Sequence, residues 1–164
     1  MKVFKSIMLI ALLATYSCTS ETALPATEVS FVLDGQTFTS RAKQNNYGIE
    51  ITSSGLNELF IDIRVDKKGL LLFCTTPVIE GTFTHLNSID GERGNRIGLC
   101  DEVDSTFCKS TGQCDETEFV FTVSRQQNNP DMLSGTFEGR VCNGQGQMVT
   151  ITAGSFKNLK QFPL

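Results

Sequence analysis

The feature that most constrains the fold is the regular spacing of short apolar runs from Val29 to the end of the chain. Clusters of Gly, Asn and Asp interrupt these runs at intervals of about 8–12 residues, which is typical of all-β domains. No segment has the apolar period of a helix. The pattern predicts a single all-β domain over residues 29–164. We expect an antiparallel β-sandwich of about ten strands, with an up-and-down, lipocalin-like β-barrel as the alternative.

A hairpin is predicted where the sequence VSFVLDGQTF places Asp34 and Gly35 between two alternating runs. This dipeptide favours a two-residue turn in which both residues have positive φ. Such a turn sets Phe31 opposite Phe38, and an aromatic cross-strand pair of this kind stabilises an antiparallel ladder.

A second hairpin is predicted between LSGTFEGRVC and QMVTITAG. A loop with an even number of residues would place the apolar residues of these two strands on opposite faces of the sheet. A three-residue loop over residues 143–145 avoids this and sets Phe137 opposite Ile151, so we expect that register. The run GLLLFCTT has no alternation, and we expect it to be buried on both faces.

Residues 1–17 have the layout of a signal peptide, in which two lysines precede an apolar run that ends in small or polar residues. The apolar run is shorter than the ~20 residues that span a bilayer. Cys18 follows the small residue Ser17, as the acylated cysteine of bacterial lipoproteins does. An ordinary signal peptidase site is the alternative. We therefore predict lipidation of Cys18 and a flexible tether over residues 18–28.

Three segments, FVLDGQTF, EGTFTHL and LSGTFEGRVCNGQGQMVTITAGSFKNL, carry a family resemblance. They resemble small uncharacterised lipoproteins of Bacteroidetes-type bacteria, which end in a pattern like SGTF…VTITNGSF. Ala153 stands where that pattern has Asn. The resemblance implies an all-β fold and a lipid-anchored location in the bacterial cell envelope, at the outer membrane, on its periplasmic or its surface face. It implies no activity, substrate or functional residue.

The charge of the chain argues against a nucleic-acid partner. The sequence holds 14 Lys and Arg and 18 Asp and Glu, a net charge of −4. Lys2 and Lys5 lie in the leader, so the mature chain has 12 basic against 18 acidic residues, or −6. An acidic domain without a basic run repels phosphate backbones. We expect the membrane as a partner through the anchor, and a protein or a glycan stays open as a further partner.

No catalytic, cofactor or metal site is predicted. The sequence has one histidine, His85, and no G-x-S-x-G motif, which disfavours a Ser-His-Asp triad. The C-x-x-C and H-x-x-x-H pairs of zinc sites do not occur. Acidic residues gather in two loops that lack the spacing of a calcium loop: one over residues 90–95, the other holding Asp101, Glu102, Asp104, Asp115 and Glu116. Paired carboxylates for glycoside hydrolysis stay open, because their separation is spatial.

The sequence has six cysteines. If the leader cysteine carries lipid, five remain, and at least one of them is unpaired. Cys108 and Cys114 bracket the short loop KSTGQ and form the first predicted disulfide. Cys100 and Cys142 lie at predicted strand ends and form the second. Cys74 closes the apolar run LLLFC and is the predicted free thiol.

These observations predict a membrane-tethered, non-enzymatic β-domain with a binding or structural role. A lipocalin-like carrier of a small apolar ligand, with the twelve Phe residues lining a cavity, is one alternative. An undetected hydrolase is the other. A pocket of roughly 300 Å³ or more would favour the carrier, and a cleft with two carboxylates would favour the hydrolase. Ser105, in the sequence Asp104-Ser105-Thr106, is a candidate O-glycosylation site.

Overall fold

The computed structural model describes residues 25–41, 45–51, 54–84, 86, 94–101, 104–111, 118–142 and 146–161. It contains no α-helix among these residues, which confirms the predicted all-β fold. Nothing in this part of the chain forms a helix long and apolar enough to cross a membrane. The strands are β1 (Glu28–Leu33), β2 (Gln36–Ser40), β3 (Asn46–Ile51), β4 (Asn57–Val65), β5 (Lys68–Thr76), β6 (Gly81–Thr84), β7 (Arg96–Asp101), β8 (Asp104–Ser110), β9 (Phe119–Gln126), β10 (Asn129–Cys142) and β11 (Met148–Gln161).

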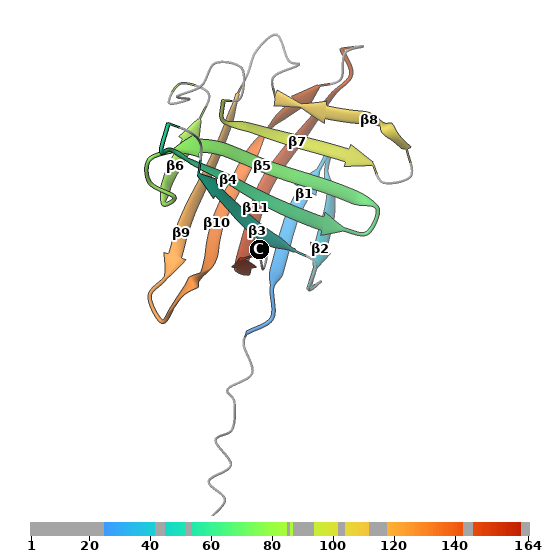
Figure 1. Cartoon of the computed structure of the whole chain (residues 1–164). Coiled ribbons are helices and arrows are strands. Elements are labelled where there is room, and N and C mark those ends of the chain that lie inside the picture. The colour runs from blue at the N-terminus through green and yellow to red at the C-terminus, as the bar shows by residue number, and fades with distance from the viewer. Residues whose placement is uncertain are drawn as a thin grey trace, which may run out of the picture.

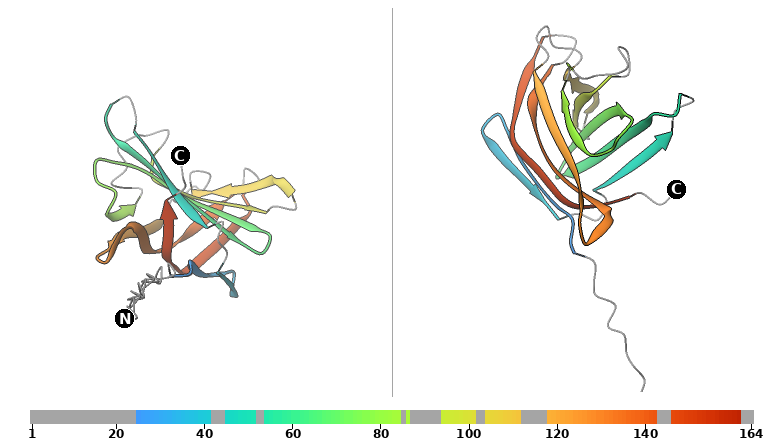
Figure 2. Two further views of the ribbon diagram at one scale, coloured as in Figure 1. Left: turned by 60° about the horizontal axis from the view of Figure 1, so that its bottom comes forward. Right: turned by 90° about the vertical axis from the view of Figure 1, so that its left-hand side faces the viewer.

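The strands form one hydrogen-bonded sheet that folds back on itself into two layers, because β10 pairs with β11 as well as with β8 and β9. The first layer has the order β2-β1-β11-β10-β9-β6, and the second has the order β3-β4-β5-β7-β8. Figure 1 shows β4, β5 and β7 crossing in front of β1, β11 and β10. Figure 2 shows the two layers from the side.

Two short pairings join the layers at their corners. The final residues of β11 pair with β3 in parallel, through Lys160 with Asn46 and Gln161 with Tyr47. The sheet is therefore mixed, and the prediction of purely antiparallel pairing was wrong at this corner. At the other corner, β10 meets β8 through the pair of Cys142 with Ser110.

The hairpin of β1 and β2 has the predicted turn and register. Asp34 has φ 46° and Gly35 has φ 84°, and Phe31 faces Phe38 with ring centroids 5.3 Å apart. The Asp34 side chain also accepts a hydrogen bond of 2.9 Å from the Thr150 amide. This bond ties the turn to β11.

The hairpin of β10 and β11 differs from its predicted register. Cys142 pairs with Met148, so the loop has five residues, and Gly139 faces Ile151 while Phe137 faces Gly154. The loop length is odd, as predicted, so the apolar residues still share one face. The register shifts along the pair because β11 bulges at residues with left-handed backbone, and Ala153 has φ 50°.

The space between the layers is filled with side chains. Alternate residues of β4, β9 and β10 point inward, and the rings of Phe31, Phe137 and Phe156 lie in contact at its centre. The expectation that GLLLFCTT is buried on both faces was wrong at Leu71, whose exposed fraction is 38%. Phe73 is nevertheless buried on the outer side, where it packs against Phe60 with ring centroids 5.2 Å apart.

The start of the domain is fixed to β11. The Asn158 amide donates to the carbonyl oxygen of Ala26 at 2.8 Å, and the Thr27 hydroxyl donates to the carbonyl oxygen of Asn158 at 3.0 Å. Asn158 holds φ 57°, a conformation that Asn tolerates better than most residues. These two bonds hold Ala26 and Thr27 against β11.

Candidate functional site

Several residues singled out in the sequence lie outside the described part of the chain. These are Cys18, His85 and Cys114, together with most of the two acidic loops. Ser105 and Cys108 lie in β8, of which the structure describes the backbone. Among the described residues, no group of three His, Cys, Asp or Glu could hold a metal ion.

The described cysteines fall into two kinds. Cys74 is a free thiol without solvent exposure, and burial raises its pKa to about 12. A thiol with this pKa is almost never ionised near neutrality and is therefore a poor nucleophile. Cys100 and Cys142 are each disulfide-bonded.

The outer face of the first layer carries a continuous line of hydroxyl side chains, which we call the hydroxyl row. Each residue of the row is the register partner of the next residue on the neighbouring strand. Each strand of the first layer therefore supplies one residue to the row. Five strand spacings separate its ends, about 24 Å. In order from β6 to β2, the row consists of Thr82, Thr122, Thr136, Ser155, Ser30 and Thr39.

Strand alternation places these hydroxyls outside. The segments T-F-T at residues 37–39 and 82–84 bury Phe38 and Phe83 between threonines that point outward. All six members of the row are exposed or half-buried. The hydroxyl oxygens of Thr122 and Thr136 lie 2.8 Å apart and share a hydrogen bond.

A groove of about 530 Å³, groove 1, lies beside the hydroxyl row over β6, β9, β10 and β11. Thr84, Val120 and Thr152 line it, and Glu118 and Glu138 contribute two carboxylates. Arg140 also lines the groove and pairs with Glu118 at 3.6 Å, in an ion pair whose side chains are well exposed. Groove 1 therefore combines hydroxyl, carboxylate and guanidinium groups with a lining that is mainly apolar and includes Leu86, Phe119 and Ile151.

A second groove of about 440 Å³, groove 2, includes the other end of the row. Ser155, Ser30 and Thr39 belong to both the row and the groove. The charged lining residues are one acid and two bases, Glu28, Arg41 and Lys157, and Glu28 pairs with Arg41 at 3.2 Å. The row and groove 2 thus offer groups that accept or donate hydrogen bonds, whereas groove 1 adds a mainly apolar lining at the other end.

The interior offers a contrast to this surface. Tyr47 is completely buried, and its hydroxyl donates to the carbonyl oxygen of Asp131 at 2.9 Å. Burial raises the pKa of Tyr47, and nearby Arg125 opposes that shift. The polar groups of this contact satisfy one another within the fold, so we assign it a structural role.

Comparison of the chain with family models, curated proteins and solved structures returns no match. The outer surface is therefore interpreted from its own chemistry. Sequence reasoning did not identify the hydroxyl row, although the repeated T-F-T segments and T-I-T at residues 150–152 were visible. Their alignment depends on which distant strands become neighbours.

Proposed function

We propose that the chain is a lipid-anchored protein of the bacterial envelope whose β-domain binds a glycan, without catalysis, along the hydroxyl row and its two grooves. The observation that carries this proposal is the unbroken line of hydroxyls across the six strands of the first layer. The lipid anchor is the predicted modification of Cys18, and the tether places the domain outside the lipid.

The chemistry of the surface favours a glycan over other partners. Hydroxyl side chains both donate and accept, so they match the hydroxyls of a sugar chain. The cores of protein interfaces are enriched in aromatic residues and Met, whereas the row consists of Ser and Thr. The lining of groove 1 has two acidic residues and one basic residue, and that of groove 2 has one acidic and two basic residues. This nearly balanced charge does not favour a nucleic-acid backbone, which binds to surfaces rich in Lys and Arg.

The packing of the interior argues for a surface ligand and against the carrier. Twenty-four buried residues from both layers form one cluster between them. Both grooves reach the roughly 300 Å³ of a small-ligand site, but they lie on the outer face of the first layer, and the space between the layers that the carrier would use is filled by side chains. A ligand at these grooves would stay in contact with water.

The proposal is tested by affinity electrophoresis of the mature domain in gels that contain a neutral glucan or an acidic hexuronate polymer. We expect one of these polymers to retard the wild-type domain. The double substitution Thr122→Val and Thr136→Val should abolish that retardation, because it removes two neighbouring hydroxyls of the row while keeping the shape of both side chains.

Ser54→Ala is the matched control, since it removes a hydroxyl from the turn between β3 and β4 in the second layer. This variant should be retarded as the wild type is. Equal mobility of the wild type in all gels, or retardation that survives the double substitution, would contradict glycan binding at the row.

A second candidate function is glycoside hydrolysis, favoured by the two carboxylates of groove 1. Glu138 of β10 pairs with Val120 of β9, and Glu118 lies two residues before Val120, just ahead of β9, so the two acids are diagonal neighbours. Hydrolases of this class use a pair of carboxylates on either side of the scissile bond. Release of reducing ends by the wild type and its loss in Glu138→Gln would establish this activity, and retardation without release would favour binding alone.

A further inference from the structure

We infer, on the basis of the proposed function, that the glycan of the hydroxyl row is an acidic polymer of amino sugars, whose repeating unit carries both a carboxylate and an N-acetyl group. The two grooves favour these two substituents separately. Groove 2 has an excess of positive charge, whereas groove 1 combines a carboxylate with apolar surface.

The grooves place one charged residue on each side of the row. Glu138 of groove 1 lies two residues after Thr136 on β10. Lys157 of groove 2 lies two residues after Ser155 on β11. Because β10 and β11 are antiparallel and Thr136 pairs with Ser155, these two steps lead in opposite directions from the row. The Cα atoms of Glu138 and Lys157 are therefore about 14 Å apart, which is longer than one sugar ring, so groups bound at the two positions belong to different residues of the glycan.

Groove 2 favours a carboxylate. Glu28 forms an ion pair of 3.2 Å with Arg41 and also faces Lys157 across β1 and β11. Lys157 itself makes no ion pair with another described residue. Its side chain is exposed, so its ammonium group can bind a carboxylate of the ligand in a charge-assisted hydrogen bond. The hydroxyls of Ser30 and Ser155 line the same groove and would hold the sugar that carries this carboxylate.

Groove 1 disfavours a carboxylate and favours an N-acetyl group. Arg140 pairs with Glu118, whereas Glu138 forms no ion pair within the described part of the chain, so a carboxylate of the ligand would be repelled there. Val120 faces Glu138, and Leu86, whose exposed fraction is 94%, adds apolar surface. An acetamido group fits both features, because its N–H can donate to the Glu138 carboxylate while its methyl group packs on Val120 and Leu86. A free amine would satisfy the carboxylate alone.

A polymer with both substituents satisfies the two grooves at once. A polymer that has carboxylates alone leaves the apolar lining of groove 1 without a partner. A polymer that has N-acetyl groups alone leaves the ammonium group of Lys157 without a carboxylate, and a neutral glucan has neither group.

The test is isothermal titration calorimetry of the full mature chain, in a neutral detergent, with three oligosaccharides of equal length. Hyaluronan oligosaccharides carry both substituents, chitin oligosaccharides carry N-acetyl groups alone, and oligogalacturonates carry carboxylates alone. We expect the hyaluronan oligosaccharide to bind about fivefold more tightly than each of the other two.

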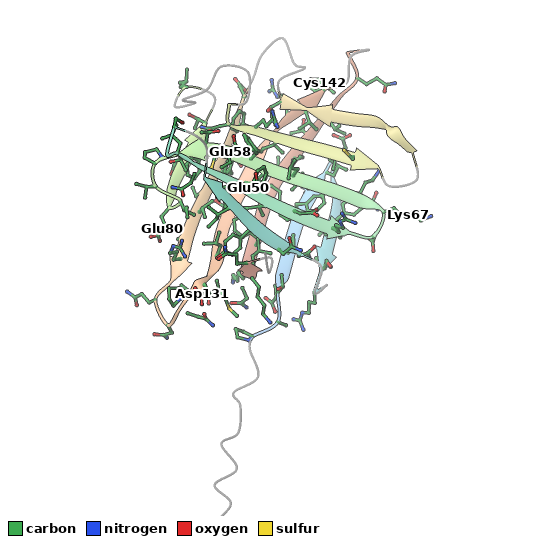
Figure 3. The ribbon with its side chains drawn as sticks, in the orientation of Figure 1. Glu50, Glu58, Lys67, Glu80, Asp131 and Cys142 are labelled. Atoms are coloured by element: carbon green, nitrogen blue, oxygen red, sulfur yellow. The ribbon has the colours of Figure 1, made fainter. Side chains whose placement is uncertain are left out.

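Two substitutions separate the contributions of the grooves. Lys157→Gln removes the cation of groove 2, so the preference for the hyaluronan over the chitin oligosaccharide should fall about fivefold. Val120→Thr replaces a methyl group of groove 1 by a hydroxyl of similar size, so the preference for the hyaluronan oligosaccharide over oligogalacturonate should fall about fourfold. Lys67→Gln is the matched control, because it removes the same charge from the exposed turn between β4 and β5 in the second layer (Figure 3). This variant should keep both preferences.

The outcomes distinguish this inference from the proposed function. The inference would be overturned, with glycan binding intact, if the chitin oligosaccharide or oligogalacturonate bound as tightly as the hyaluronan oligosaccharide, or if either preference survived its substitution. It would also be overturned if none of the three bound while the neutral glucan retarded the chain in gels. Binding to none of these polymers would contradict the proposed function itself.

Discussion

Ala153 sits in a backbone conformation that an alanine adopts at a cost. Its φ of 50° lies in the left-handed region, in the bulge of β11, and its side chain is exposed. A Cβ atom in this region costs about 1–2 kcal/mol. Glycine removes that cost, but its greater flexibility in the unfolded chain destabilises the folded state by about 0.5–1 kcal/mol. We therefore expect Ala153→Gly to raise the free energy of unfolding by about 0.5–1 kcal/mol.

The matched control is Thr152→Gly at the preceding residue, which is also exposed but has no positive φ. Glycine relieves no strain at this position, so we expect the free energy of unfolding to fall by about 0.5–1 kcal/mol. Urea unfolding followed by far-UV circular dichroism measures both values, provided that the slope with denaturant stays constant. The reasoning would be refuted if Ala153→Gly destabilised the domain, because the positive φ of Ala153 requires that substitution to relieve strain.

Three further predictions concern the packing and charge of the fold. A Cβ atom at Gly135 would overlap the backbone of β9, so we expect Gly135→Ala to lower the free energy of unfolding in urea by about 3 kcal/mol. Gly48→Ala is the control and should lower it little, because its Cβ atom would lie 3.8 Å from its nearest neighbour. Burial raises the pKa of Cys74 to about 12, so the folded state holds the thiol proton more tightly than the unfolded chain does. The free energy of unfolding should therefore fall as the pH rises from 9 towards 12. Cys74→Ala should make that fall smaller. Glu50 of β3 faces Glu58 of β4, and both are labelled in Figure 3. Glu50→Lys should therefore raise the free energy of unfolding by about 0.5 kcal/mol at low salt. An unchanged or lower midpoint of urea unfolding would contradict this.

Local features of the fold could be predicted from the sequence. Asp34-Gly35 determined the turn and hence the pairing of Phe31 with Phe38, because a two-residue turn leaves one register. The alternation of β4 likewise identified its buried face. Each of these features depends on residues that are close in sequence.

Features that depend on distant pairing could not be predicted. The bulge at Ala153 shifts the register of β10 and β11 by one residue, and no rule of alternation predicts an inserted residue. The sequence also did not indicate that β8 lies between the strands of Cys100 and Cys142. The hydroxyl row was missed for the same reason, since Ser30 and Thr136 belong to one line only because β11 separates β1 from β10.

The most direct test of the proposed binding surface is a titration of the isotope-labelled mature domain with the polysaccharide that retards it, followed by amide chemical shifts. We predict that the largest shifts fall on the six residues of the hydroxyl row and on Glu138, Arg41 and Lys157 in the grooves. Amides on the outer face of the second layer, such as Asp62 and Leu71, should stay unchanged. Shifts confined to the second layer, or no shifts at saturating ligand, would contradict the account.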